Sequence, residues 1–181
     1  RIFIWDITRS MVGVSCLTPP HYCVTEGGNI DAKVRLGLKG EIDKIKNDGG
    51  SFRIVTFRQN VLDNVEFSNS EQGIKDAKEF IERVKITKEM AGGTNICGAW
   101  EEAMKFVKPN RKNVIYLYTD GHQSASLGGP NCLKETLDKY CRLTAGSETF
   151  AFYCTLNLKD NKFSEYLNKA CDNLKLVNIE I

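Results

Sequence analysis

The chain has 181 residues, of which 41% are hydrophobic and 27% are charged, a composition typical of a globular domain rather than a disordered chain. Its 25 basic and 23 acidic residues leave a net charge of +2, so it lacks the clustered basic excess of a nucleic-acid-binding protein. No apolar run approaches the roughly 18–20 residues that a membrane-spanning helix needs. We expect one domain over residues 1–181, trimmed from a longer chain because it lacks an initiator Met.

Strand and helix patterns alternate along the chain. Runs rich in β-formers predict strands, and apolar residues at helical spacing predict helices. In chain order, the expected elements are a strand at 1–7, a helix at 34–45, strands at 51–57 and 61–67, helices at 74–84 and 96–107, a strand at 113–120, a helix at 133–141, a strand at 149–156, a helix at 163–174 and a strand at 174–181.

Repeated strand–helix units predict an α/β fold, doubly wound and Rossmann-like, with helices on both faces of a mostly parallel central sheet. The short polar turn Arg58-Gln59-Asn60 predicts a hairpin, which gives the sheet one antiparallel edge strand. Trp5 and Trp100 fit buried positions of the core. In such folds ligands bind beyond the carboxyl ends of the strands, where the strand order reverses, so the residues after strand ends are the candidate functional residues.

The segment after the first strand carries three side-chain oxygens, from Asp6, Thr8 and Ser10. One carboxylate and two hydroxyls in a turn are a hard, oxygen-only ligand set of the kind that Mg²⁺ or Mn²⁺ prefers. The alternative is that Asp6 caps the next turn and the hydroxyls bond the backbone.

Two further segments precede a helix or follow a strand. Gly92 and Gly93 permit tight turns just before the helix at 96–107, and either Thr94 or Asn95 is a candidate cap for that helix. Asp120 ends the apolar strand at 113–120, where a buried acid is costly unless it is paired, hydrogen-bonded or beside a metal. A plain Asp-Gly turn is the alternative for Asp120.

These three segments, "DITRSM", "GGTN" and "YTDG", resemble the signature loops of the von Willebrand factor A (vWA) domain family. The family's motifs are D-x-S-x-S after the first strand, a Thr in a Gly-Gly-Thr loop and an Asp after a central strand, and they build a metal-ion-dependent adhesion site. The resemblance implies Mg²⁺ or Mn²⁺ ligands at Asp6, Thr8, Ser10, Thr94 and Asp120.

The chain departs from the family pattern at two positions. Thr8 stands where the family most often has Ser, which keeps the hydroxyl and adds a methyl group. Arg9 stands where a small residue is frequent, and its positive charge either opposes cation binding or points away from the site.

The resemblance implies a protein-binding module rather than an enzyme, with a partner protein that supplies an Asp or Glu carboxylate to the metal. One alternative is a Mg²⁺-dependent hydrolase or phosphotransferase of α/β fold. A haloacid-dehalogenase-type enzyme would carry a second acid two residues after Asp6, where this chain has Thr8, and His122 is the nearby general-base candidate. Another alternative is a scaffold domain with a vestigial metal site.

Seven cysteines, with no C-x-x-C pair, favour thiols buried as small apolar residues, such as Cys141 and Cys154, in a reducing cytoplasm. A secreted or periplasmic location is the alternative, and Cys16 and Cys23 are the plausible local disulfide. With His21 those two cysteines offer only three ligands to zinc, which usually takes four.

The connection at 11–29 is long, since links between a strand and the next helix usually run about 2–6 residues. Pro19-Pro20 stiffens its middle and Gly27-Gly28 precedes the helix, while Leu17, His21 and Tyr22 are its contact-capable side chains. We expect this connection to form a rim that selects the partner, and the alternative is a plain surface loop.

Overall fold

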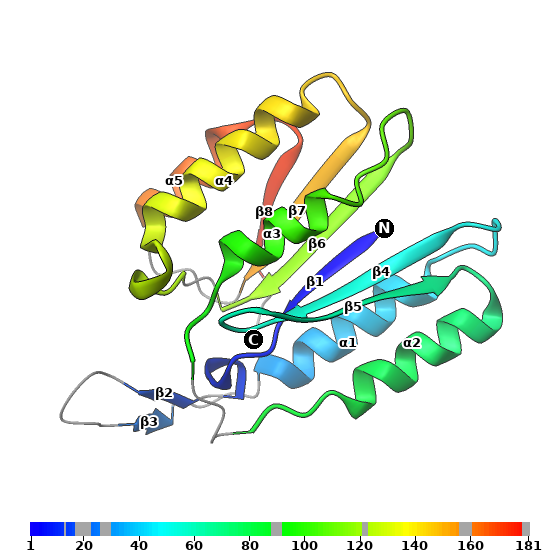
Figure 1. Cartoon of the computed structure of the whole chain (residues 1–181), viewed down its shortest axis with the longest axis horizontal. Helices are drawn as coiled ribbons and strands as arrows, with labels where there is room; N and C mark the ends of the chain where they lie inside the picture. Colours follow the sequence, from blue (N-terminus) through cyan, green and yellow to red (C-terminus); the bar gives the residue numbers. More distant parts are fainter. Residues whose placement is uncertain are drawn as a thin grey trace.

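The computed structural model describes residues 1–12, 14–16, 23–25, 30–87, 92–120, 123–155 and 161–178. Its centre is a six-stranded sheet with the order β5-β4-β1-β6-β7-β8 (Figure 1). Strands β4 and β5 pair antiparallel, and the other neighbouring strands pair parallel. The expected doubly wound sheet with one antiparallel edge strand is therefore confirmed. The strands are β1 (Ile2–Asp6), β4 (Ser51–Phe57), β5 (Val61–Ser68), β6 (Asn113–Thr119), β7 (Thr149–Thr155) and β8 (Leu174–Asn178).

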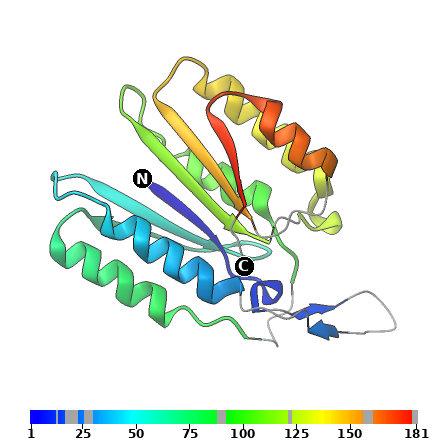
Figure 2. The ribbon, with the colours of Figure 1, turned by 180° about the vertical axis from the view of Figure 1, so that it is seen from behind.

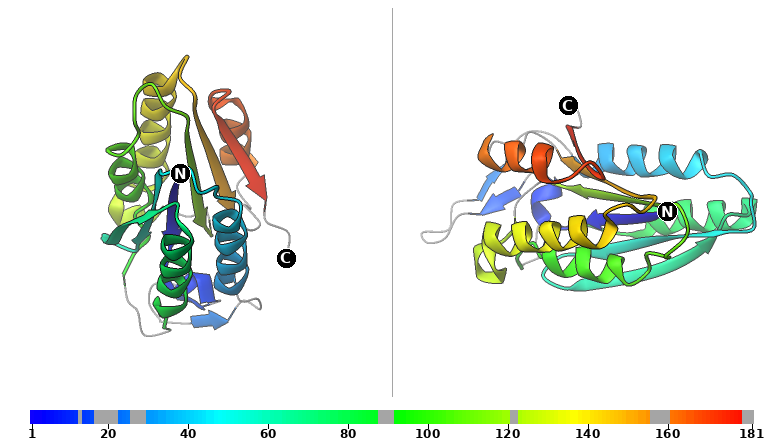
Figure 3. Two further views of the ribbon diagram at one scale, coloured as in Figure 1. Left: turned by 90° about the vertical axis from the view of Figure 1, so that its right-hand side faces the viewer. Right: turned by 90° about the horizontal axis from the view of Figure 1, so that it is seen from above.

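Helices cover both faces of this sheet (Figures 1 and 3). The side chains of β1 alternate between two cores: Ile2 and Ile4 face α3 (Ile96–Met104) and α4 (Gly129–Thr144). On the opposite face, Phe3 and Trp5 lie in the core built with α1 (Ile30–Asp43) and α2 (Glu71–Arg83). Helix α5 (Asn161–Ala170) packs beside β8 and α4. Trp5 and Trp100 are both fully buried, as expected.

Three helix ends differ from their expected positions. Helix α3 ends at Met104 because the amides of residues 105, 106 and 107 donate to carbonyls three residues back and tighten the chain into turns. Helix α1 ends at Asp43, so the buried Ile45 lies beyond it. Helix α5 ends at Ala170, and Leu174 begins β8. Ile45 and Leu174 are buried although they lie outside the helices, so their apolar character does not mark the helix ends.

The long connection after β1 contains elements that the sequence did not reveal. It begins with a 3₁₀ turn, η1 (Arg9–Val12), and continues with β2 (Val14–Cys16) and β3 (Cys23–Thr25). These two strands form an antiparallel pair separate from the main sheet (Figure 2). Their register places Cys16 directly opposite Cys23. The remaining residues singled out in this connection, from Leu17 to Tyr22 and at Gly27-Gly28, lie outside the described residues.

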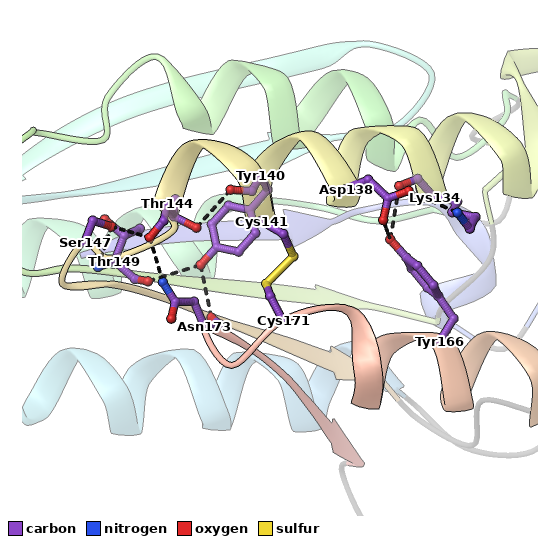
Figure 4. Close-up of a disulfide and its surroundings, with 10 residues drawn as sticks. All are labelled: Lys134, Asp138, Tyr140, Cys141, Thr144, Ser147, Thr149, Tyr166, Cys171 and Asn173. Atoms are coloured by element: carbon purple, nitrogen blue, oxygen red, sulfur yellow. Dashed lines mark hydrogen bonds and ion pairs between the residues drawn. A yellow bond between two sulfur atoms is a disulfide. The ribbon is translucent and has the colours of Figure 1, made fainter.

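Two disulfides overturn the expectation that Cys141 is a buried thiol. One joins Cys97 of α3 to Cys132 of α4, and the other joins Cys141 of α4 to Cys171 after α5 (Figure 4). The partners are 35 and 30 residues apart in sequence, and only the packing of the helices brings them together. Cys154 on β7 is a buried free cysteine, as expected.

In the part of the chain that the structure describes, no helix combines the length and the apolar character that crossing a membrane requires.

Candidate metal centre

The candidate site lies where the order of the strands reverses. From β1 the chain proceeds to β4 on one side, and it later returns to β6 on the other side of β1. Asp6 is the last residue of β1 and Asp120 directly follows β6. The two acids that the sequence placed after separate strands therefore lie at the carboxyl ends of neighbouring strands, where doubly wound folds bind ligands.

Asp6 is fully buried and accepts three hydrogen bonds from the described residues. Its Oδ1 accepts from the backbone N–H of Thr8 at 2.9 Å and from the Thr8 hydroxyl at 2.7 Å. Its Oδ2 accepts from the Thr119 hydroxyl at 2.7 Å. The Thr8 and Ser10 hydroxyl oxygens are 2.9 Å apart. The first motif therefore forms a continuous cluster of oxygens, and the turn-capping bonds of Asp6 coexist with it.

The negative charge of Asp120 affects the ionisation of Asp6. Burial raises the pKa of Asp6, the negative charge of Asp120 raises it further, and the hydrogen bonds from Thr8 and Thr119 oppose both effects. The described hydrogen bonds to Asp6 come from neutral donors, so they leave its negative charge uncompensated. A divalent cation beside both acids would compensate that charge.

The loop before α3 is hydrogen-bonded to the loop after β6 and to the turn after β4. The Thr94 amide donates to the Ser124 hydroxyl at 2.7 Å, and the Ser124 amide donates to the Thr94 carbonyl at 3.0 Å. The Asn95 amide donates to the Arg58 carbonyl at 2.8 Å, just past the end of β4. Asn95 is the cap of α3, because its Oδ1 accepts from the Gly98 amide at 3.0 Å. Thr94, a buried residue, is therefore not the helix cap.

Sequence reasoning missed three residues that assemble the site. Thr119 bonds Asp6, Ser124 bonds the Thr94 loop, and the Gln123 side chain accepts from the Cys97 amide at 3.2 Å. Thr119 could have been found from the sequence, because it directly precedes Asp120. It also alternates with Ile115 and Leu117, which face the α3–α4 core. A Cβ on Gly93 would lie 2.7 Å from the Ser124 hydroxyl oxygen, so this close approach of the two loops requires glycine.

The donor set fits a hard cation. Two carboxylates and three hydroxyls offer only oxygen, which suits Mg²⁺ or Mn²⁺ and not a soft metal. Among the described residues, no three or more His, Cys, Asp and Glu side chains gather into a cluster that could hold a metal by themselves. A metal centre here would therefore need hydroxyl or water ligands beside the two acids, and Thr8, Ser10 and Thr94 are the hydroxyls that the sequence predicts. His122 and His21, named for the alternative chemistries, lie outside the described residues.

The sequence matches no protein-family model and no curated protein. Solved structures share its fold, however. The conserved hypothetical protein BatB from Bacteroides thetaiotaomicron superposes with a TM-score of 0.58 at 18% identity, over 84% of this chain and 65% of that one. Proximal thread matrix protein 1 from the mussel byssus has a TM-score of 0.54 at 20% identity, over 86% of this chain and 34% of that one.

A third similar structure is the open conformation of the pilus adhesin SpaC from Lactobacillus rhamnosus GG. Its TM-score is 0.61 at 12% identity, over 99% of this chain and 28% of the adhesin. This chain therefore spans less than two thirds of the length of each of these three proteins. At these identities the likeness concerns the fold alone, and it agrees with the α/β fold that the order of strands and helices predicted.

Proposed function

We propose that this chain is a divalent-metal-dependent protein-binding module. A cation at the carboxyl end of the sheet captures an Asp or Glu carboxylate of a partner protein. The observation that carries this proposal is the convergence of three separate loops, joined by the Thr119–Asp6 hydrogen bond and by the reciprocal Thr94–Ser124 bonds. The proposed ligands, directly or through water, are Asp6, Thr8, Ser10, Thr94 and Asp120.

The charge of this ligand set would allow a bound ion to accept a carboxylate from a partner protein. Mg²⁺ takes six oxygens in an octahedral arrangement. Three of the five proposed ligands are neutral hydroxyls and only two are carboxylates, so the ion stays electrophilic. A partner carboxylate can then replace one of its waters. The β2–β3 hairpin follows the Asp6 motif in the chain, and it is the element that we expect to select the partner.

The same residues favour a binding module over an enzyme. A phosphotransferase that begins at Asp6 would need a second acid where this chain has Thr8, and Thr8 uses its hydroxyl to hold Asp6. In a vestigial scaffold, the buried Asp6 beside the charge of Asp120 would be an unfavourable arrangement with no cation to offset it. The names of two similar structures, a pilus adhesin and a thread matrix protein, agree with an adhesive role.

The two disulfides indicate in which cellular compartment the protein works. Cys97–Cys132 and Cys141–Cys171 favour an oxidising setting, because disulfides persist outside the reducing cytoplasm. We therefore propose an extracellular or periplasmic location in place of the expected cytoplasm.

Titration calorimetry and thermal unfolding with millimolar Mg²⁺ or Mn²⁺ test the proposal. The wild-type protein should bind the ion and gain stability by mass action, and Asp120→Ala should lose both effects. Asp138→Ala is the matched control, because Asp138 lies on α4 and bonds Lys134 and Tyr166 (Figure 4). If the wild-type protein binds neither ion, the proposal is wrong. Hydrolysis of generic phosphate esters that is lost in Asp120→Ala would favour the enzyme.

A further inference from the structure

Two buried hydroxyls on β7 have no hydrogen-bond partner among the described residues. They are Tyr153 Oη and Thr155 Oγ1, and both side chains are fully buried. Burying a hydroxyl without a partner is unfavourable, so such groups in native proteins generally serve an ordered water or a ligand. By contrast, Tyr140, a buried tyrosine in the same core, donates its hydroxyl to the Asn173 carbonyl at 3.0 Å (Figure 4).

The sheet register places Thr155 in the row of the candidate site. Thr119 of β6 is paired with Thr155 of β7, and on the other side the Thr119 hydroxyl bonds Asp6 at the end of β1. Two residues earlier on these strands, Ile4, Leu117 and Tyr153 lie together in the α3–α4 core, which fixes the face to which this row points. Asp6, Thr119 and Thr155 are therefore successive positions of one polar row across the sheet.

Tyr153 lies one row deeper and is influenced by both acids. Burial raises the pKa of its phenol well above the ordinary value, and the charges of Asp120 and then Asp6 raise it further. The phenol consequently stays protonated and remains a hydrogen-bond donor. Phe163 of α5 packs edge-on against its ring, with the centroids 5.9 Å apart, and restrains its orientation.

We infer that the Tyr153 and Thr155 hydroxyls hydrogen-bond the water that accompanies the cation at Asp6 and Asp120. They are positioning residues, since they act on water rather than on the ion. The inference rests on the proposed function. Mg²⁺ gives up its water reluctantly and usually keeps several molecules in protein sites, and groups that hold the outer shell typically change metal affinity by about 10–100-fold.

Two substitutions and two matched controls test this role, with Mg²⁺ affinity and metal-free stability measured separately. Tyr153→Phe should weaken Mg²⁺ binding about tenfold. It should leave the metal-free protein equally stable or more stable, because it deletes an unsatisfied hydroxyl. Tyr140→Phe should do the opposite: it should lower metal-free stability and leave Mg²⁺ affinity unchanged, because the Tyr140 hydroxyl bonds Asn173. Thr155→Val should weaken binding, whereas Thr155→Ser, which keeps the hydroxyl, should not.

The outcomes separate this inference from the proposed function. If the wild-type protein binds Mg²⁺ and Tyr153→Phe and Thr155→Val bind it within twofold of wild type, the inference is wrong while the metal centre stands. If Tyr153→Phe destabilises the metal-free protein as Tyr140→Phe does, its hydroxyl has a protein partner and the inference is also wrong. If the wild-type protein binds no divalent ion, the proposed function fails and the inference fails with it.

Discussion

The Thr119 hydroxyl donates a hydrogen bond to Asp6 Oδ2 at 2.7 Å, joining residues 113 positions apart in the sequence. The bond connects the ends of β6 and β1, the two central strands of the sheet. Because β6 leads directly into Asp120, the same bond fixes the distance between the loops that carry the two acids.

Replacement of Thr119 by Val should therefore affect both stability and metal binding. Val keeps the shape of Thr in the strand but deprives the buried Asp6 of a donor, which should cost about 1–3 kcal/mol of unfolding free energy. Mg²⁺ affinity should fall as well, because Asp6 loses the bond that orients it. Urea unfolding and calorimetry measure the two effects. Thr119→Ser is the control that retains the hydroxyl, and equal behaviour of the Val and Ser variants would contradict the role of the bond.

The charge state of Asp6 predicts a dependence on pH. Because burial and the Asp120 charge raise its pKa in the folded protein, folding disfavours the ionised carboxylate. Protonated Asp6 therefore stabilises the metal-free folded protein. This stabilisation should be complete below the unfolded-state pKa of about 3.9 and should be lost as the pH rises through the folded-state pKa. A cation favours the ionised form, so stabilisation by saturating Mg²⁺ should grow over the same interval.

Urea unfolding between about pH 4 and pH 8, with and without Mg²⁺, measures this dependence. Asp6→Asn is the control, since it cannot ionise and should show a weaker dependence on pH and little response to Mg²⁺. A wild-type protein whose metal-free stability rises with pH more steeply than that of Asp6→Asn would disprove the prediction.

The approach of the Thr94 loop to the loop after β6 depends on Gly93. A methyl group there would lie 2.7 Å from the Ser124 hydroxyl oxygen and 3.1 Å from a Leu127 methyl carbon, so Gly93→Ala should push the loops apart and weaken Mg²⁺ binding. Gly40→Ala is the matched control, because Gly40 lies in the last turn of α1 and nothing lies within 4 Å of the added carbon. It should raise stability by roughly 0.5–1 kcal/mol through helix propensity and leave metal binding unchanged. Equal Mg²⁺ affinities of the two variants would refute the role of Gly93.

The Cys141–Cys171 disulfide should contribute substantially to stability. It connects α4 to the turn after α5, and it closes a loop across 30 residues of sequence, for which the expected contribution is about 2–4 kcal/mol. The double variant Cys141→Ala, Cys171→Ala should show that loss of unfolding free energy in urea under non-reducing conditions. A reducing agent should cause no further loss through this pair, because the variant has no 141–171 bond to reduce. Peptide mapping of the oxidised wild-type protein should recover the 141–171 linkage. Recovery of free thiols at both positions would count against it.

Much of the fold followed from local sequence signals. The strands at Ser51–Phe57 and Asn113–Thr119 were predictable because their apolar β-forming runs are uninterrupted, and the polar turn at 58–60 indicated the hairpin. The positions of Asp6 and Asp120 at the ends of strands followed in the same way, since a strand end is marked by the residues that terminate an apolar run. What each acid binds stays a prediction.

Tertiary structure alone decided the relationships that span the chain. The Cys97–Cys132 pair depends on which faces of α3 and α4 meet, and no local pattern specifies that contact. The choice of Asn95 rather than Thr94 as the helix cap depends on the bonds that Ser124 and Arg58 make to this loop. Spacing along the sequence determines which residues can share a face or a turn. Sheet register and helix packing determine which of them meet, because those contacts form only when distant segments are buried together.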